Sequence, residues 1–400
     1  MVSPKTVEYI AGAPGHVPPR HPIVHYPVGM TPRPCLHRRR FLQTLPAGPL
    51  ALSSQFASHA ATLKGLGMPG PYKGRVVDVE HPGAIVNGAY QAGPITTMMR
   101  RGMQDLTGAD GWIDAWKRFF EPGDVVGIKV NPVGQPHVIS APEVLREIIA
   151  GVMATGVKAQ DIVVYDRYRR QFLQAGFDKW LPEKVRWMHA AEDYDEIQLS
   201  IDGYDRDHYM EMALVQPGQD LANLTMRRSF ASNFISKSVN KLINLCVLKD
   251  HQSAGVTLAL KNLSHGLVNN VARSHSSVSL NACGAFIPAV VQMPVIRNKA
   301  VLHILDGVKG LYHGGPGAKP QFVWEHKHIY FATDPVALDH VGWRVIDAKR
   351  LAVGKSKLVD DKPDEFSHFI HRQPEHIEIA GAMGLGEWNW DKIDLRAVSY

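Results

Sequence analysis

Val125-Val-Gly-Ile-Lys-Val130, a helical pattern and then Asp161-Ile-Val-Val-Tyr165 follow one another in the chain, and this order decides the fold. The first segment is short, mostly apolar and bounded by turn residues, which is typical of a strand buried on both faces. Pro142 suits the start of a helix that runs to about Ala154, and Gly156 suits its end. A strand, a helix and a second strand form a βαβ unit, so we expect an α/β fold with a mostly parallel sheet flanked by helices.

Other segments extend this pattern on both sides of the unit. Strands are predicted at 75–80, 242–248, 300–305 and 328–332, and helices at 95–106, at 112–120 and from Pro335 to about Asp347 with Asp334 as N-cap. The segment 168–238 has no clear period and is open to interpretation as an inserted subdomain. We therefore expect one α/β domain over residues 75–400, preceded by a Gly/Pro-rich junction at 61–74.

Residues 1–60 have the parts of a twin-arginine leader in the right order. Arg38-Arg-Arg-Phe-Leu-Gln43 resembles the twin-arginine consensus, a weakly apolar stretch follows, and Ser58-His-Ala60 has small residues for cleavage after Ala60. A basic surface loop is the competing interpretation. Met30 is an alternative start, in which case residues 1–29 are not translated. The leader predicts passage through the twin-arginine translocase and a periplasmic or otherwise extracytoplasmic location.

The net charge of +6 raises the question of a nucleic-acid partner. Six of the 44 Lys and Arg residues but only one of the 38 acids lie within 1–60, so the rest of the chain is close to neutral. Without a basic stripe or zinc-finger spacing, we expect no nucleic-acid partner. No apolar run approaches the roughly 18–20 residues that span a bilayer, so we expect no stable membrane insertion.

The cysteine count limits the cofactors. Cys35 lies in the leader, which leaves Cys246 and Cys283 in the mature chain. Two cysteines cannot hold a cubane cluster alone, so we expect no iron-sulfur cluster. Whether these two cysteines pair with each other stays open.

The densest group of candidate site residues follows the predicted strand at 242–248. Its members are Lys249, His251, Lys261, Asn262 and His275. Ligands of α/β proteins bind at the carboxyl ends of strands. Lys261 closes an otherwise apolar run, and a lysine there needs an anion or a covalent partner.

Two roles are open for the histidines of this group. Neutral imidazoles of His251 and His275 suit Ni, Fe or Zn, while lysine and asparagine side chains bind carboxylate or phosphate. Alternatively, both are ordinary pocket histidines that donate hydrogen bonds to carbonyl groups.

Lys129 lies on an otherwise apolar strand two residues before Asn131. Its ammonium therefore either emerges at the strand end to bind an anion or pairs with an acid such as Asp306 or Asp339. The glycine-rich segment 314–317 is either a loop near a site or a plain turn.

These residues belong to a pattern that resembles the domain-of-unknown-function 362 family over about 125–379. The matching residues are Ile128-Lys-Val-Asn131, Leu242-Ile-Asn244, Leu248-Lys-Asp-His251, Thr257, Leu260-Lys-Asn262, His275, Asp306-Gly307, Gly315-Pro316, Asp334-Pro-Val-Ala-Leu-Asp339 and Gly384-Leu-Gly386. The family usually has K-T-H where this chain has Lys249-Asp250-His251. Many members also carry a ferredoxin-like cysteine cluster, which this chain lacks.

The central segment is also similar to nickel-pincer lactate racemases. Those enzymes have a metal-binding histidine, a lysine ten residues later that holds the cofactor covalently, and a second metal-binding histidine. His251, Lys261 and His275 have this order and the same first spacing. The likeness implies a transition metal on the two histidines and a cofactor linked to Lys261. A further histidine of the racemases has no counterpart, because the comparable place is Asp166-Arg167-Tyr168.

Together these features predict an exported enzyme of redox or isomerase type that acts on a small carboxylate or phosphate. Lys129, Asn131 and Lys249 are the predicted catalytic residues, which bind and orient this anionic ligand. Lys261 and Asn262 are the predicted cofactor-binding residues. The alternative is a periplasmic protein that binds an anion or serves as a scaffold and performs no chemistry.

Overall fold

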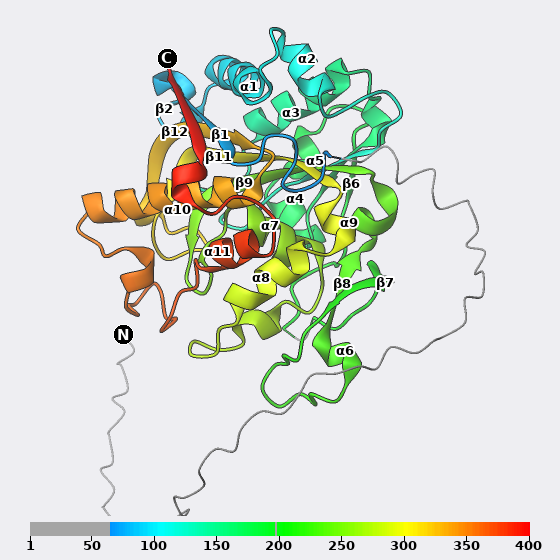
Figure 1. Cartoon of the computed structure of the whole chain (residues 1–400), viewed down its shortest axis with the longest axis vertical. Coiled ribbons are helices and arrows are strands. Elements are labelled where there is room, and N and C mark those ends of the chain that lie inside the picture. Colours follow the sequence, from blue (N-terminus) through cyan, green and yellow to red (C-terminus); the bar gives the residue numbers. More distant parts are fainter. Residues whose placement is uncertain (1–64, 197) are drawn as a thin grey trace, which may run out of the picture. The chain divides into compact units, whose positions relative to one another are not determined.

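The computed structural model describes residues 65–196 and 198–400, which are coloured in Figure 1. A nine-stranded sheet has the order β13-β1-β12-β11-β9-β4-β5-β6, with β10 paired to β9. Its strands are β1 (Arg75–Glu80), β4 (Val126–Lys129), β5 (Ile162–Tyr165), β6 (Arg186–Met188), β9 (Lys241–His251), β10 (Gly255–Val256), β11 (Ala300–Leu311), β12 (Val323–Ala332) and β13 (Asp394–Ser399). The run from β11 to β6 is parallel, whereas β12 is antiparallel to both neighbours. The predicted α/β fold with a mostly parallel sheet is confirmed.

The βαβ unit has the predicted elements. Helix α3 (Pro142–Ala154) begins with its proline and connects β4 to β5, which pair side by side. Lys129 at the end of β4 is opposite Tyr165 on one side and Asn244 of β9 on the other. The carboxyl ends of β4 and β5 therefore lie next to each other and beside Asn244 of β9, which continues past them to His251.

Helices cover both faces of the sheet, as Figure 1 shows. One face packs against α1 (Ala92–Thr107), α2 (Trp112–Lys117), α3, α4 (Arg169–Gln174) and α5 (Phe177–Trp180), and the other against α7 (Leu258–Leu267), α8 (Cys283–Val291), α9 (Pro294–Arg297), α10 (Pro335–Ala352) and α11 (His376–Ala382). Side chains of β9 alternate between the two cores, with Ile243 and Leu245 in the first and Leu242 and Cys246 in the second. The sheet is therefore the middle of three layers.

Several elements differ in length from the prediction, among them β11 and β12, which are both longer. β9 continues to His251, since its last residues pair with β10. α10 continues to Ala352, and its predicted N-cap Asp334 accepts hydrogen bonds from the backbone N–H groups of Val336 and Ala337, both at 3.0 Å. α2 ends at Lys117 instead of residue 120.

The segment 168–238 divides into two parts. Its first part supplies α4, α5 and β6 of the main sheet. Its second part contains a separate two-stranded sheet made of β7 (Tyr204–Glu211) and β8 (Arg228–Ser232), with α6 (Leu224–Arg227) between them. The predicted leader at 1–60 and residues 61–64 of the junction lie outside the described residues. Within the part that the structure describes, no helix is both long and apolar enough to cross a membrane.

Candidate functional site

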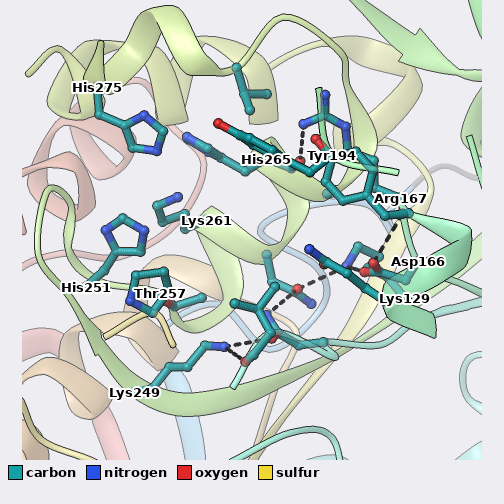
Figure 2. A pocket seen from close by; sticks show the side chains of 18 of the residues that line it. Lys129, Asp166, Arg167, Tyr194, Lys249, His251, Thr257, Lys261, His265 and His275 are labelled. Atoms are coloured by element: carbon teal, nitrogen blue, oxygen red, sulfur yellow. Dashed lines mark hydrogen bonds and ion pairs between the residues drawn. The ribbon is translucent and has the colours of Figure 1, made fainter. Parts of the chain in front are cut away.

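A cavity of about 210 Å³ lies at the carboxyl ends of β4, β5 and β9 (Figure 2). It is lined by every residue that the sequence singled out for a site, namely Lys129, Asn131, Lys249, His251, Lys261, Asn262 and His275. These residues come from two strands, the segments that follow them and helix α7. The structure thus brings together groups that are up to 146 positions apart in the chain.

Lys129 is fixed by its neighbours on the sheet. Its ammonium lies 2.7 Å from a carboxylate oxygen of Asp166 and donates hydrogen bonds to the carbonyl oxygen of Val130 at 2.5 Å and to Oδ1 of Asn262 at 3.1 Å. Asp166 directly follows β5, which pairs with β4, so strand pairing brings the two residues together. Lys129 is 2% exposed, and an ion pair offsets the cost of burying its charge.

Of the two alternatives for Lys129, pairing with an acid is the one that the structure shows, but the acid is Asp166 and neither of the two examples, Asp306 and Asp339. Asp306 accepts a backbone N–H at the start of α3 at 2.9 Å. Asp339 of α10 accepts the backbone N–H groups of Ala259 and Leu260 at 2.7 and 2.8 Å. Both carboxylates serve helix N-termini, where unpaired N–H groups favour an anion. Asp339 thereby fixes the start of α7, the helix that carries Lys261.

A series of hydrogen bonds between asparagine side chains connects Lys129 with Lys249 along the floor of the cavity. Asn131 donates to Oδ1 of Asn262 at 3.0 Å, and Asn262 donates to Oδ1 of Asn244 at 2.7 Å. Lys249 donates to Oδ1 of Asn131 at 2.7 Å and to the carbonyl oxygen of Val133. We call the set Lys129, Asp166, Asn131, Asn262, Asn244 and Lys249 the amide network. Burial, followed by the charges of Lys129 and Lys261, lowers the pKa of Lys249 to about 7.

Lys261 has a different environment from the other two lysines. It lies one helical turn before His265 on α7, so both side chains are on one face of the helix. Lys261 is 6% exposed, and the described residues offer its ammonium no hydrogen-bond acceptor or ion-pair partner. Burial lowers its pKa from 10.5 to about 8. Figure 2 shows its amine turned toward the space between His251 and His275.

The three histidines around Lys261 are held in different ways. Nδ1 of His251 accepts hydrogen bonds from the backbone N–H groups of Ser253 at 3.1 Å and Ala254 at 3.3 Å. The proton of its neutral ring is therefore on Nε2. His275, in contrast, lies near the backbone carbonyl groups of residues 272 and 275, and its neutral ring has one nitrogen that can act as an acceptor. Both ring nitrogens of His265 lie 3.0 Å from serine hydroxyl groups.

Burial is the main influence on the pKa of these histidines, and the charge of Lys261 is the second. Together they lower the pKa of His275 to about 4 and hold the pKa values of His251 and His265 well below the usual range. All three rings are consequently neutral at pH 7.

The hydrogen bonds of His251 do not fit the predicted metal role. A histidine that binds a metal through one nitrogen normally donates its other N–H to an acceptor, whereas Nδ1 of His251 accepts two N–H groups. The described residues also contain no group of three or more His, Cys, Asp and Glu side chains that would hold a metal ion. We therefore derive no chemistry from a metal on His251 and His275. A cofactor linked to Lys261 is compatible with the amine's position.

Positive charge is in excess around the cavity. Among its lining residues Lys129, Lys249, Lys261 and Arg167 face one carboxylate, Asp166, which pairs with Lys129. Arg167 is buried and donates to neutral oxygens, among them the Tyr204 hydroxyl at 3.0 Å and Gln198 Oε1 at 3.1 Å. The cavity therefore favours an anion.

Sequence reasoning missed several lining residues. Asp166 and Arg167 directly follow β5, so the rule that ligands bind at strand ends would have found them. His265 is four positions after Lys261, a spacing that places both on one face of a helix. Tyr194 and Gln198 come from a long connection without a periodic pattern and gave no such signal.

The glycine-rich segment 314–317 lies at the site. Pro316 lines the cavity, and the backbone N–H of Gly315 donates to Oδ1 of Asp250 at 2.9 Å. The other carboxylate oxygen of Asp250 accepts from Arg372 at 3.0 Å. Of the two interpretations, a loop near a site is the one that the geometry supports.

The two cysteines of the described chain are unpaired. Cys246 and Cys283 are both buried and belong to no disulfide. Sγ of Cys283 lies 3.7 Å from the hydroxyl oxygen of Ser253, beside the segment that holds His251. Burial raises the pKa of both thiols, so they are protonated at neutral pH.

A comparison with protein families identifies the family of the chain. Residues 126–344 match the family described as Domain of unknown function (DUF362), a stretch that begins at β4 and ends within α10. It contains all seven predicted site residues. A search of curated proteins gives no match. Since the matched stretch is more than half of the chain, the protein belongs to the DUF362 family.

Proposed function

We propose that the protein is an enzyme that binds a small carboxylate or phosphate in the cavity and catalyses a proton transfer on it, as isomerases do. The observation that carries the proposal is the buried ammonium of Lys261, which has no anionic partner in the described chain. A buried charge is costly unless it is paired. A bound anion supplies the missing partner.

The cavity's charge and size support a small anionic ligand. Its cations outnumber its one carboxylate, and the amide network fixes Lys129 and Lys249 before a ligand arrives. Its volume of about 210 Å³ is below the range of about 300–1,000 Å³ that is typical of sites for drug-sized molecules. A second recess of about 450 Å³ shares Tyr194, His251, His275 and Pro316 with the cavity and offers room for the approach of a ligand.

Two neutral imidazoles supply the acid and the base that a proton transfer needs. The Nε2–H group of His251 is a donor, while a ring nitrogen of His275 is an acceptor. The two ring centroids are 5.9 Å apart, which leaves both within reach of one small ligand. Binding of an anion next to Lys261 reduces the positive field at His275 and raises its pKa toward the range of an effective base.

The proposal is tested by binding and by exchange. The purified full chain is titrated calorimetrically with lactate, glycolate and phosphate, and the two hydroxy acids, lactate and glycolate, are then incubated with the protein in D₂O and followed by proton NMR. We expect binding of at least one of the two hydroxy acids and loss of its Cα–H signal. In the variant Lys261→Met both effects disappear, whereas Lys117→Met, the same change at an exposed lysine of α2, leaves them unchanged.

The results of the binding and exchange experiments distinguish an enzyme from a protein that only binds an anion. Binding without exchange for any of these acids would contradict catalysis by proton transfer and favour the non-catalytic anion-binding or scaffold protein. Absence of binding for all anions would contradict both.

We also propose that the protein is exported by the twin-arginine translocase to the periplasm. Support comes from the sequence of residues 1–60, with the pair Arg38 and Arg39 before Phe41 and Leu42. Cell fractionation of the native chain and of the double variant Arg38→Lys, Arg39→Lys tests this. We expect the variant to stay in the cytoplasm, and equal distribution of the two chains would contradict export by this route.

A further inference from the structure

We infer that Lys261 is a nucleophile that forms an imine with the carbonyl group of a small 2-oxo acid bound in the cavity. The inference rests on the proposed function, because it uses the same anion-binding cavity. It adds the class of substrate and a covalent step.

The geometry distinguishes Lys261 from the other lysines of the cavity. Lys129 contacts Asp166, Val130 and Asn262, and Lys249 donates to two oxygens. These contacts fix both nitrogens at the floor of the cavity and direct them at protein oxygens, away from a bound carbonyl group. The amine of Lys261 has no such contact in the described part of the chain and is turned into the cavity (Figure 2).

The surroundings of Lys261 supply the neutral amine that attack on a carbonyl requires. Burial in the cavity, with Arg167 as a nearby cation, lowers its pKa to about 8, so a sizeable fraction of the amine is unprotonated near neutral pH. Its neighbours on the open side are the neutral rings of His251 and His275 rather than carboxylates. Desolvation of a lysine in this manner is a general route to an amine nucleophile.

The carboxylate of a 2-oxo acid finds donors beside the amine. Lys249 uses two of its three N–H donors on Asn131 and Val133, which leaves one for a ligand. This places the acid's charge near the floor of the cavity and its adjacent carbonyl carbon toward Lys261. Thr257, which also lines this part of the cavity, has a buried hydroxyl group without a hydrogen-bond partner in the described structure.

The covalent step balances without an oxidant or a reductant. The lone pair of the Lys261 nitrogen forms a bond to the carbonyl carbon, while the electron pair of the C=O π bond moves to the oxygen, which accepts a hydrogen bond from the Nε2–H group of His251. His275 carries one proton from the nitrogen to this oxygen, which becomes a hydroxyl group. The C–O bond then breaks as the nitrogen lone pair forms the C=N bond, and the second proton of the nitrogen passes through His275 to the departing hydroxyl group, which leaves as water. The products are an imine between Lys261 and the acid and one molecule of water.

The imine is tested by trapping it. The purified full chain is incubated with pyruvate and sodium cyanoborohydride, which reduces a C=N bond to a stable amine, and is then digested and mapped by mass spectrometry. We expect the pyruvate-derived mass on the peptide that contains Lys261 and a gain of at least tenfold over any other lysine peptide. Lys249 is the matched internal control, since it is equally buried in the same cavity but hydrogen-bonded.

A variant and a second ligand separate failure of the imine from failure of the proposed function. Lys261→Arg keeps a cation but cannot form an imine, so we expect it to lose the adduct. Lactate has no carbonyl group next to its carboxylate and should slow trapping by competition. If pyruvate or lactate stabilises the protein against heat but leaves no adduct on Lys261, the imine is overturned while anion binding stands. If neither ligand binds, or if the adduct is spread evenly over exposed lysines, both the imine and the selective cavity are overturned.

Discussion

The two sides of the cavity differ in how they treat buried lysines. On the side of the sheet, Lys129 and Lys249 are held by the amide network and by Asp166. On the side of helix α7, Lys261 is equally buried but has no partner among the described residues. The difference teaches that burial alone does not identify a functional lysine. The absence of a partner does, because the fold has no use of its own for that charge.

The largest expected effect on stability is on the sheet side of the cavity, where Asp166 pairs with Lys129. Asp166→Ala leaves Lys129 as a buried cation without a counter-ion, which costs about 3–5 kcal/mol in free energy of unfolding. Denaturation with urea measures it. The matched change on the other side is Lys261→Met, which removes an unpaired charge and should not destabilise the protein. A loss below about 1 kcal/mol for Asp166→Ala would show that the two sides do not differ.

The second prediction concerns how the free energy of unfolding depends on pH through Lys261, on the helix side of the cavity. Since the pKa of Lys261 falls from 10.5 to about 8 on folding, the folded state binds fewer protons than the unfolded state between these values. The destabilisation by Lys261 is therefore complete below pH 8 and is lost as the pH rises toward 10.5. We expect Lys261→Met to exceed the native chain in stability by up to about 3 kcal/mol at pH 7, and this excess to shrink above pH 8. Denaturation curves at pH 7, 8, 9 and 10 check this, and an excess independent of pH would contradict it.

The smallest expected effect on stability is at the place where helix α7 contacts Lys129 of the sheet side. A methyl group at Gly266 of α7 would meet Cε of Lys129, so Gly266→Ala displaces that lysine and costs about 1–3 kcal/mol. Gly93→Ala in α1 is the control, because a methyl group there meets nothing within 4 Å. Thermal unfolding of both variants measures the difference. Equal stability of the two would mean that Lys129 can move without cost.

Local patterns in the sequence predicted much of the fold. β4, α3 and β5 were predicted because an apolar run, a proline at a helix start and a glycine at its end act over neighbouring residues. The division of 168–238 was not predicted, since β6 joins the main sheet through a parallel pairing that short segments do not reveal.

The sequence predicted which residues form the site but not which contacts these residues make. Strand ends and a lysine in an apolar run identified Lys129, Lys249 and Lys261. An ion pair of Lys129 was one of two alternatives, but its partner Asp166 was not among the examples, because the partner depends on the order of strands, in which β4 lies next to β5. The role of His251 could not be predicted either, since it depends on two backbone N–H groups that a tight turn directs at Nδ1.

The central claim is that Lys261 is the reactive lysine of the cavity, and its reactivity measures this most directly. The full chain is labelled with a trace of acetic anhydride at a series of pH values, and each lysine peptide is quantified by mass spectrometry, with and without phosphate. We predict that Lys261 titrates with a pKa of about 8 and is protected by phosphate, while Lys129 stays unlabelled. Labelling of Lys261 with an ordinary pKa near 10.5, or without protection by phosphate, would contradict the account.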